Sequence, residues 1–121
     1  MKSRPEELRD RTKRFALDVI RFIRSLPRTE EARILGRQLL KSSTSVAANY
    51  RAVCRARSKS KFVSRLGWVV EEVDETVFWL EIIQDAGISA GGAMASLLDE
   101  ANQLVAIFAA SQRTARSSMA Q

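Results

Sequence analysis

A chain of 121 residues, 45% of them hydrophobic and 28% charged, has the size and composition of one globular domain. It holds no apolar run of about 20 residues, so a membrane-spanning helix is not expected, and its start, MKSRPEELRD, lacks the apolar core of a signal peptide. The single cysteine, Cys54, excludes an internal disulfide, and the cytoplasm is the expected compartment.

The net charge of +6 is unevenly distributed along the chain. Residues 1–65 hold 18 Lys and Arg against 6 Asp and Glu, whereas residues 66–121 hold 2 against 8. Such a division allows the basic part to bind a polyanion, and it equally allows the two parts to pair within a bundle or between subunits. Charge alone leaves both interpretations open.

Apolar residues recur every three to four positions in four segments, which we predict to be amphipathic helices: 6–26, 30–57, 59–86 and 93–110. Pro27 ends the first helix, Thr29 is the predicted N-cap of the second, and Gly87 ends the third. The basic residues of the first helix are interpreted as a solvated surface. Residues 111–121 lose the periodicity and are predicted to be a disordered tail of this single domain.

The second predicted helix contains the run Ser42-Ser43-Thr44-Ser45, whose residues are poor helix formers. The apolar spacing stays in register across this run, so one continuous helix is predicted. Asn49 falls on the apolar face and needs a hydrogen-bonding partner there. We interpret it as part of a polar layer rather than as a ligand site.

A dense group of basic residues spans the corner between the second and third helices, with Ser58 as the expected turn. Capping of the second helix explains part of it, and phosphate binding is the hypothesis for the rest. Apart from Phe62, which belongs to the core stripe, no aromatic side chain for base stacking is interleaved with it, so sequence-specific readout is not expected. The candidate nucleic-acid-binding residues are Arg33, Arg37, Arg51, Arg55, Arg57, Lys59, Lys61 and Arg65.

The third predicted helix has two stripes. Beside the stripe that faces the core lies a second one, and this second stripe contains Trp68, Glu72, Glu75 and Trp79. A helix with large apolar side chains outside its core stripe is usually buried on more than one side. This favours self-association through the second stripe. The two glutamates could pair with arginines of the second helix or of a neighbouring subunit. A two-metal site is disfavoured because the chain has no histidine.

The stretch SLPRTEEARILGRQLLKSSTSVAANYRAVCRARSKSKFVSRLGWVVEEVDETVFWLEII resembles a bacterial family named for proteins encoded in 23S rRNA intervening sequences. The resemblance covers Phe15 to Phe108 and is most specific at residues 45–51 and 71–80. It implies an all-α, antiparallel up-and-down four-helix bundle that assembles into a ring-shaped homo-oligomer, a pentamer. A more distantly similar fold is the accessory protein of diversity-generating retroelements, in which a basic barrel binds nucleic acid and reverse transcriptase.

Carrying the motif over to this chain predicts a buried or interfacial polar network between the second and third helices. Arg51 belongs to the same motif, but its helical angle points it away from the core stripe, so it could instead reach a neighbouring subunit. The network is expected to include Ser45, Asn49, Trp68, Glu72, Glu75 and Trp79.

These observations predict a non-enzymatic, oligomeric protein that binds RNA or DNA electrostatically. The alternative is a structural or adaptor protein that recognises a protein partner through its acidic, tryptophan-bearing helix. Neighbouring arginines could lower the pKa of Cys54, but we interpret it as a small core residue. No catalytic residue, cofactor, metal or small-molecule substrate is predicted.

Overall fold

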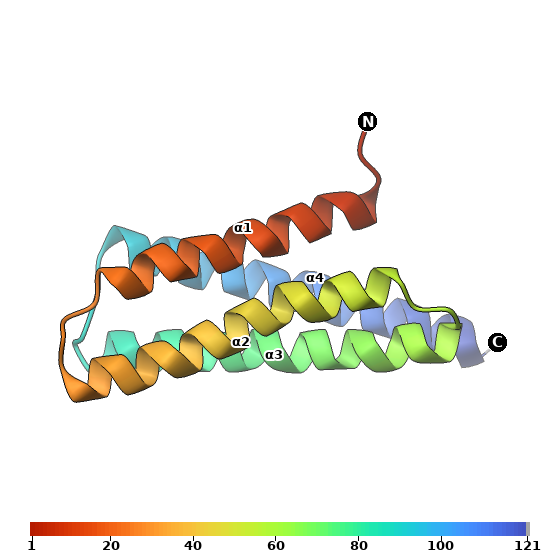
Figure 1. Cartoon of the computed structure of the whole chain (residues 1–121). Coiled ribbons are helices and arrows are strands. Elements are labelled where there is room, and N and C mark those ends of the chain that lie inside the picture. Colours follow the sequence, from red (N-terminus) through yellow and green to blue (C-terminus); the bar gives the residue numbers. More distant parts are fainter. Residues whose placement is uncertain (121) are drawn as a thin grey trace.

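Four helices account for nearly all of the computed structural model, which describes residues 1–120 and, at Ala120, the backbone only. The helices are α1 (Arg4–Arg24), α2 (Glu30–Cys54), α3 (Lys59–Asp85) and α4 (Gly92–Ala120), and these residues form no β-strand. Each helix packs against the next, and α1 makes a shorter contact with α4 (Figure 1). The predicted all-α four-helix bundle is confirmed.

Side-chain caps fix where the helices begin. The hydroxyls of Ser3, Thr29 and Ser58 each accept a hydrogen bond from the backbone N–H three residues further along, at 3.3, 3.2 and 3.1 Å. Ser3 makes α1 begin two residues before its predicted start. At the end of α3, Gly87 has a φ of 74°, and the N–H of Ile88 bonds the carbonyl of Ile83 at 3.1 Å.

The apolar stripes of all four helices meet in one continuous core, as their spacing predicts. Tyr50 of α2 packs against Phe108 of α4, with ring centroids 5.0 Å apart. Cys54 is half-buried and packs against this core. The fully buried large side chains include Phe15, Val19, Leu39, Val46, Val53, Leu66, Val69, Leu80, Ile83, Met94, Leu104 and Phe108.

The polar run of α2 is helical, and the hydroxyls of its first three residues bond to carbonyls of the preceding turn. Ser43 and Thr44 both donate to the carbonyl of Leu40, at 3.2 and 2.7 Å. Ser42 is buried and accepts a hydrogen bond from the buried Thr76 of α3 at 2.9 Å. A polar layer therefore joins α2 to α3 inside the core.

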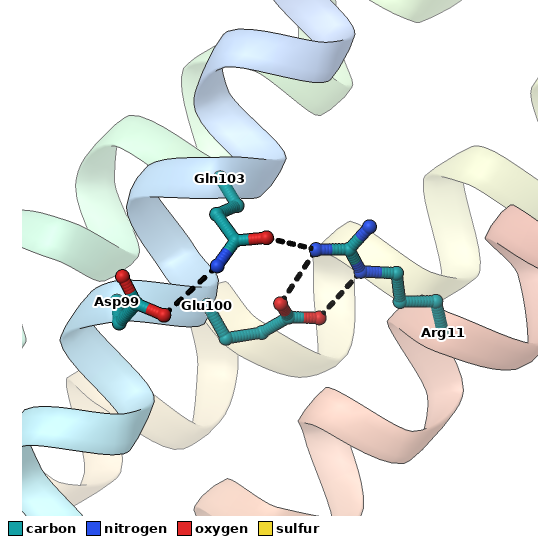
Figure 2. Close-up of polar contacts among 4 residues, drawn as sticks. All are labelled: Arg11, Asp99, Glu100 and Gln103. Carbon is teal, nitrogen blue, oxygen red and sulfur yellow. Dashed lines mark hydrogen bonds and ion pairs between the residues drawn. The ribbon is translucent and has the colours of Figure 1, made fainter.

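A charged contact joins α1 to α4, which pack against each other over a shorter length than the other helix pairs (Figure 2). The Arg11 guanidinium donates to both carboxylate oxygens of Glu100 at 2.7 Å and to Gln103 at 2.9 Å. Gln103 in turn donates to Asp99 at 2.8 Å. Bidentate pairing of this kind fixes the orientation of both partners, so it sets the position of α1 along α4.

The C-terminal part of α4 differs from the prediction. Residues 111–120, expected to be a disordered tail, continue the helix to Ala120, and Gln121 lies outside the described residues. Ala115 is buried, and a Cβ added at Gly67 of α3 would lie only 2.8 Å from Nε2 of Gln112. Packing against the start of α3 thus supports a helix whose own apolar periodicity is weak.

Candidate functional site

The antiparallel order brings basic segments from three helices to one end of the bundle. The N-terminus of α1, the C-terminus of α2 and the first turn of α3 all lie at this end (Figure 1). Their cationic side chains are exposed and are called the basic end below. The basic end consists of Lys2, Arg4, Arg9, Arg51, Arg55, Arg57, Lys59 and Lys61.

A groove of about 720 Å³ runs between α1 and α2 beside the basic end. Small side chains line it from both helices: Ala16, Thr44, Ala47 and Ala48. Cationic and acidic side chains complete the lining: Lys2, Glu6, Arg9, Asp10, Lys13, Arg51 and Arg55. We call it the α1–α2 groove.

Most cations of the α1–α2 groove have no carboxylate partner among the described residues. Within residues 1–120 the ion pairs are Lys2–Asp10, Arg11–Glu100 and Arg21–Asp18. The hydrogen bond from Lys2 lowers the pKa of Asp10, so this carboxylate stays ionised and its charge is balanced by Lys2. The other groove cations are therefore available to an external anion.

The contribution of α1 to this surface was missed by the sequence analysis, which treated its basic residues as a solvated helix surface. Arg9 and Lys13 lie one helical turn apart, as do Arg51 and Arg55. Antiparallel packing of α1 on α2 sets these two rows on opposite sides of the α1–α2 groove. The i, i+4 spacing in both helices is the signal that could have found it.

The eight candidate nucleic-acid-binding residues do not form one surface. Arg33 and Arg37 are exposed on the first turns of α2, and the rise of an α-helix puts Arg37 about 21 Å from Arg51 along the axis. Arg65 is half-buried and donates to the backbone carbonyl of Ala52 at 3.3 Å, so it joins α3 to α2. The other five lie at the basic end: Arg51, Arg55, Arg57, Lys59 and Lys61.

The outward side of α3 combines exposed aromatic rings with carboxylates. Trp68 and Phe78 are 54% and 50% exposed. Phe78 meets Trp79 edge to face at 4.9 Å, and the indole N–H of Trp79 donates to Glu75 at 3.2 Å. At 100° per residue, six side chains fall within one strip, which we call the acidic aromatic face: Trp68, Glu71, Glu75, Phe78, Trp79 and Ile82.

Of the residues predicted to form a polar network between α2 and α3, Trp79 and Glu75 are the pair that bond to each other in the described chain, and both belong to α3. Arg51 lines the α1–α2 groove, so it lies on the side of α2 that faces α1 rather than α3. Ser45 and Asn49 are half-buried, and the buried hydroxyl pair between α2 and α3 is Ser42 with Thr76.

Glu72 belongs to the predicted network, and the fold changes its acidity. Partial burial raises the pKa of this carboxyl, and the nearby Glu75 and Glu71 raise it further, while Lys41 of α2 opposes the shift. The charge on Glu72 is thus held at a cost to the folded state.

Two further properties of the described chain concern metals and membranes. In residues 1–120, no three or more His, Cys, Asp or Glu side chains are grouped so that they could hold a metal ion. No helix in that range is long and apolar enough to cross a membrane.

Comparison with known proteins agrees with this architecture. A solved structure of a protein of unknown function from the S23 ribosomal protein family of Bacteroides thetaiotaomicron superposes with a TM-score of 0.83. It covers 92% of this chain and 99% of its own at 21% identity, which shows a common fold. Among curated proteins, none matches the chain. The profile described as 23S rRNA-intervening sequence protein matches residues 6–110. This chain therefore belongs to the 23S rRNA-intervening sequence protein family.

Proposed function

We propose that this protein is a non-enzymatic helical bundle that assembles into a ring-shaped homo-oligomer and binds RNA or DNA through the phosphate backbone. The observation that carries the proposal is the basic end, where eight exposed cations from three helices and one corner gather at one end of the bundle. Phosphate contacts dominate the affinity of proteins for nucleic acids, and this surface offers that chemistry.

The composition of the basic end favours binding without reading of bases. Its members are lysines and arginines, and the α1–α2 groove beside it is lined by small side chains rather than aromatic rings. Stacking platforms are what retain unpaired bases, so this surface would hold the backbone only. A ring would place several basic ends together, which would strengthen binding by multivalency.

The test is light scattering of nuclease-treated protein, with and without a mixed RNA and DNA pool, at two salt concentrations. We expect the complex to form at low salt and to weaken steeply as salt rises. Replacing Arg57, Lys59 and Lys61 with Ser should lower affinity by at least about 30-fold and leave the oligomer intact, because these residues lie outside the α1–α2 groove.

Arg33→Ser with Arg37→Ser provides the control, because these arginines lie at the other end of α2. This variant should keep its affinity within about threefold of the parent chain. Binding that is absent, or that does not change with salt, would contradict the proposal.

The acidic aromatic face favours a second candidate function, that of a structural or adaptor protein. Its carboxylates would repel a nucleic acid, and its exposed rings are the side chains that protein interfaces use most. In that case a pull-down would recover a protein partner that survives nuclease treatment.

A further inference from the structure

We infer that the acidic aromatic face of one copy docks into the α1–α2 groove of a second copy, so that subunits join head to tail. This inference rests on the assembly part of the proposed function and names the two surfaces that would make the contact. It is carried by side chains that the core leaves exposed and by charges that the chain leaves unmatched.

The first argument is the exposed aromatic area on α3. Trp68 and Phe78 leave about half of their surface in water, although the stripe of α3 that fills the core is complete without them. Covering such rings is a main source of affinity at interfaces, where tryptophan is enriched among the residues that matter most.

The second argument is the match of shape and charge. The α1–α2 groove has small residues along it, which leave room for bulky rings, and has Lys13 and Arg51 beside them. Glu71 and Glu75 flank the rings on α3, and within residues 1–120 none of these four residues forms an ion pair. Docking would pair both sets of charges and set arginine against tryptophan.

The third argument is that one chain cannot satisfy both surfaces by itself. In the described chain α1 makes no packing contact with α3, so the groove and the face of one copy lie apart. Two acidic aromatic faces would repel each other, which disfavours a symmetric contact of like surfaces. A head-to-tail contact between different surfaces closes into a ring when its rotation allows.

The contact would cover the members of the basic end that line the groove, such as Arg51 and Arg55, and would leave the remaining cations for nucleic acid. It uses the sides of the bundle, whereas Arg57, Lys59 and Lys61 lie at its end. Rotational symmetry puts equivalent ends at the same height, so all basic ends would line one rim of the ring.

The test uses two full-length variants, each damaged on one surface only. Lys13→Glu with Arg51→Glu disables the groove, and Trp68→Ala with Glu75→Lys disables the face. Each variant alone should be a folded monomer by circular dichroism and light scattering. Mixed in equal amounts, they should form a dimer of one copy each, because one intact groove and one intact face remain.

Trp68→Ala alone should raise the dissociation constant of the assembly by at least about 30-fold. If the mixture stays monomeric while the parent chain assembles, or if only the face variant dissociates, the head-to-tail contact is wrong. A monomeric parent chain would overturn the assembly itself. Nucleic-acid binding is measured separately with Arg57 and Lys59, so its failure is distinguishable from both results.

Discussion

The outer surfaces of α2 and α3 differ although both helices fill the same core. Outside its buried stripe α2 carries arginines, small residues, the exposed Ile34 and two carboxylates in its first turn, whereas α3 carries two tryptophans, a phenylalanine and carboxylates. The core needs only one stripe from each helix. What lies outside that stripe is therefore not explained by folding, and in this protein it is cationic on one side and acidic and aromatic on the other.

Residues of the same type consequently have different roles at different positions in the bundle. Phe108 is fully buried against Tyr50, whereas Phe78 is half exposed on α3. Arg65 bonds a backbone carbonyl of α2, whereas Arg57 is exposed at the corner. Position in the bundle, rather than residue type, separates side chains that hold the fold from those available to partners.

The largest expected effect contrasts a buried aromatic residue with an exposed one. Phe108→Ala should lower the free energy of unfolding by about 3–5 kcal/mol, because it removes a ring from the close-packed core. Trp68→Ala should change it by less than about 0.5 kcal/mol, because that ring is largely in water. Urea unfolding followed by circular dichroism measures both.

Assembly would itself add to apparent stability, so both substitutions belong in the Lys13→Glu, Arg51→Glu background. A Trp68→Ala loss close to that of Phe108→Ala would mean that the acidic aromatic face serves the fold of the single chain. The distinction between side chains that hold the fold and side chains available to partners would then not apply to Trp68.

A smaller effect should separate two arginines of the basic cluster. Arg65→Ala should cost about 1 kcal/mol of unfolding free energy, because the carbonyl of Ala52 loses a hydrogen bond between α2 and α3. Arg57→Ala should leave stability within about 0.5 kcal/mol. It should instead reduce the slope of log affinity against log salt by about 0.9, the value of one phosphate contact.

Urea unfolding and nucleic-acid titrations at several salt concentrations measure the two quantities on the same samples. Equal changes in the salt slope for both arginines would show that Arg65 also contacts the ligand. The division of the cluster into a structural and a binding part would then be wrong.

The helices were predictable because their information is local. The seven-residue spacing of Leu39, Val46 and Val53, two helical turns each, is visible in the sequence, and so is the Thr29 cap. The last part of α4, residues 111–120, was missed because it packs through small residues such as Ala115, which give little periodic signal.

The candidate site was less predictable because it depends on packing between helices. Arg9 and Lys13 join Arg51 only once α1 lies antiparallel to α2. Conversely, Arg33 has an arginine four residues further along, as Arg51 has. Several turns of α2 nevertheless separate Arg33 from Arg51. Spacing along one helix therefore identified the charges, and only the fold decided which of them meet.

The smallest expected effect tests the boundary between the core and the acidic aromatic face, where Glu72 is half-buried. Its pKa in the folded chain lies above the ordinary value of 4.5, mainly because burial disfavours the charge. The folded state therefore binds this proton more tightly than the unfolded chain. The resulting stabilisation is complete below the unfolded pKa and is lost as the pH rises through the folded pKa.

Glu72→Gln should accordingly raise the free energy of unfolding at pH 7, by no more than about 0.5 kcal/mol because the side chain is only partly buried. The gain should vanish as the pH falls below the ordinary carboxyl pKa, where the native Glu72 is itself neutral. Urea unfolding across this pH range measures it in the assembly-free background, with the exposed Glu81→Gln on the same helix as the control for net charge. A loss of stability at pH 7 would show instead that the attraction of Lys41 outweighs burial, and that α2 and α3 are joined there by an ion pair.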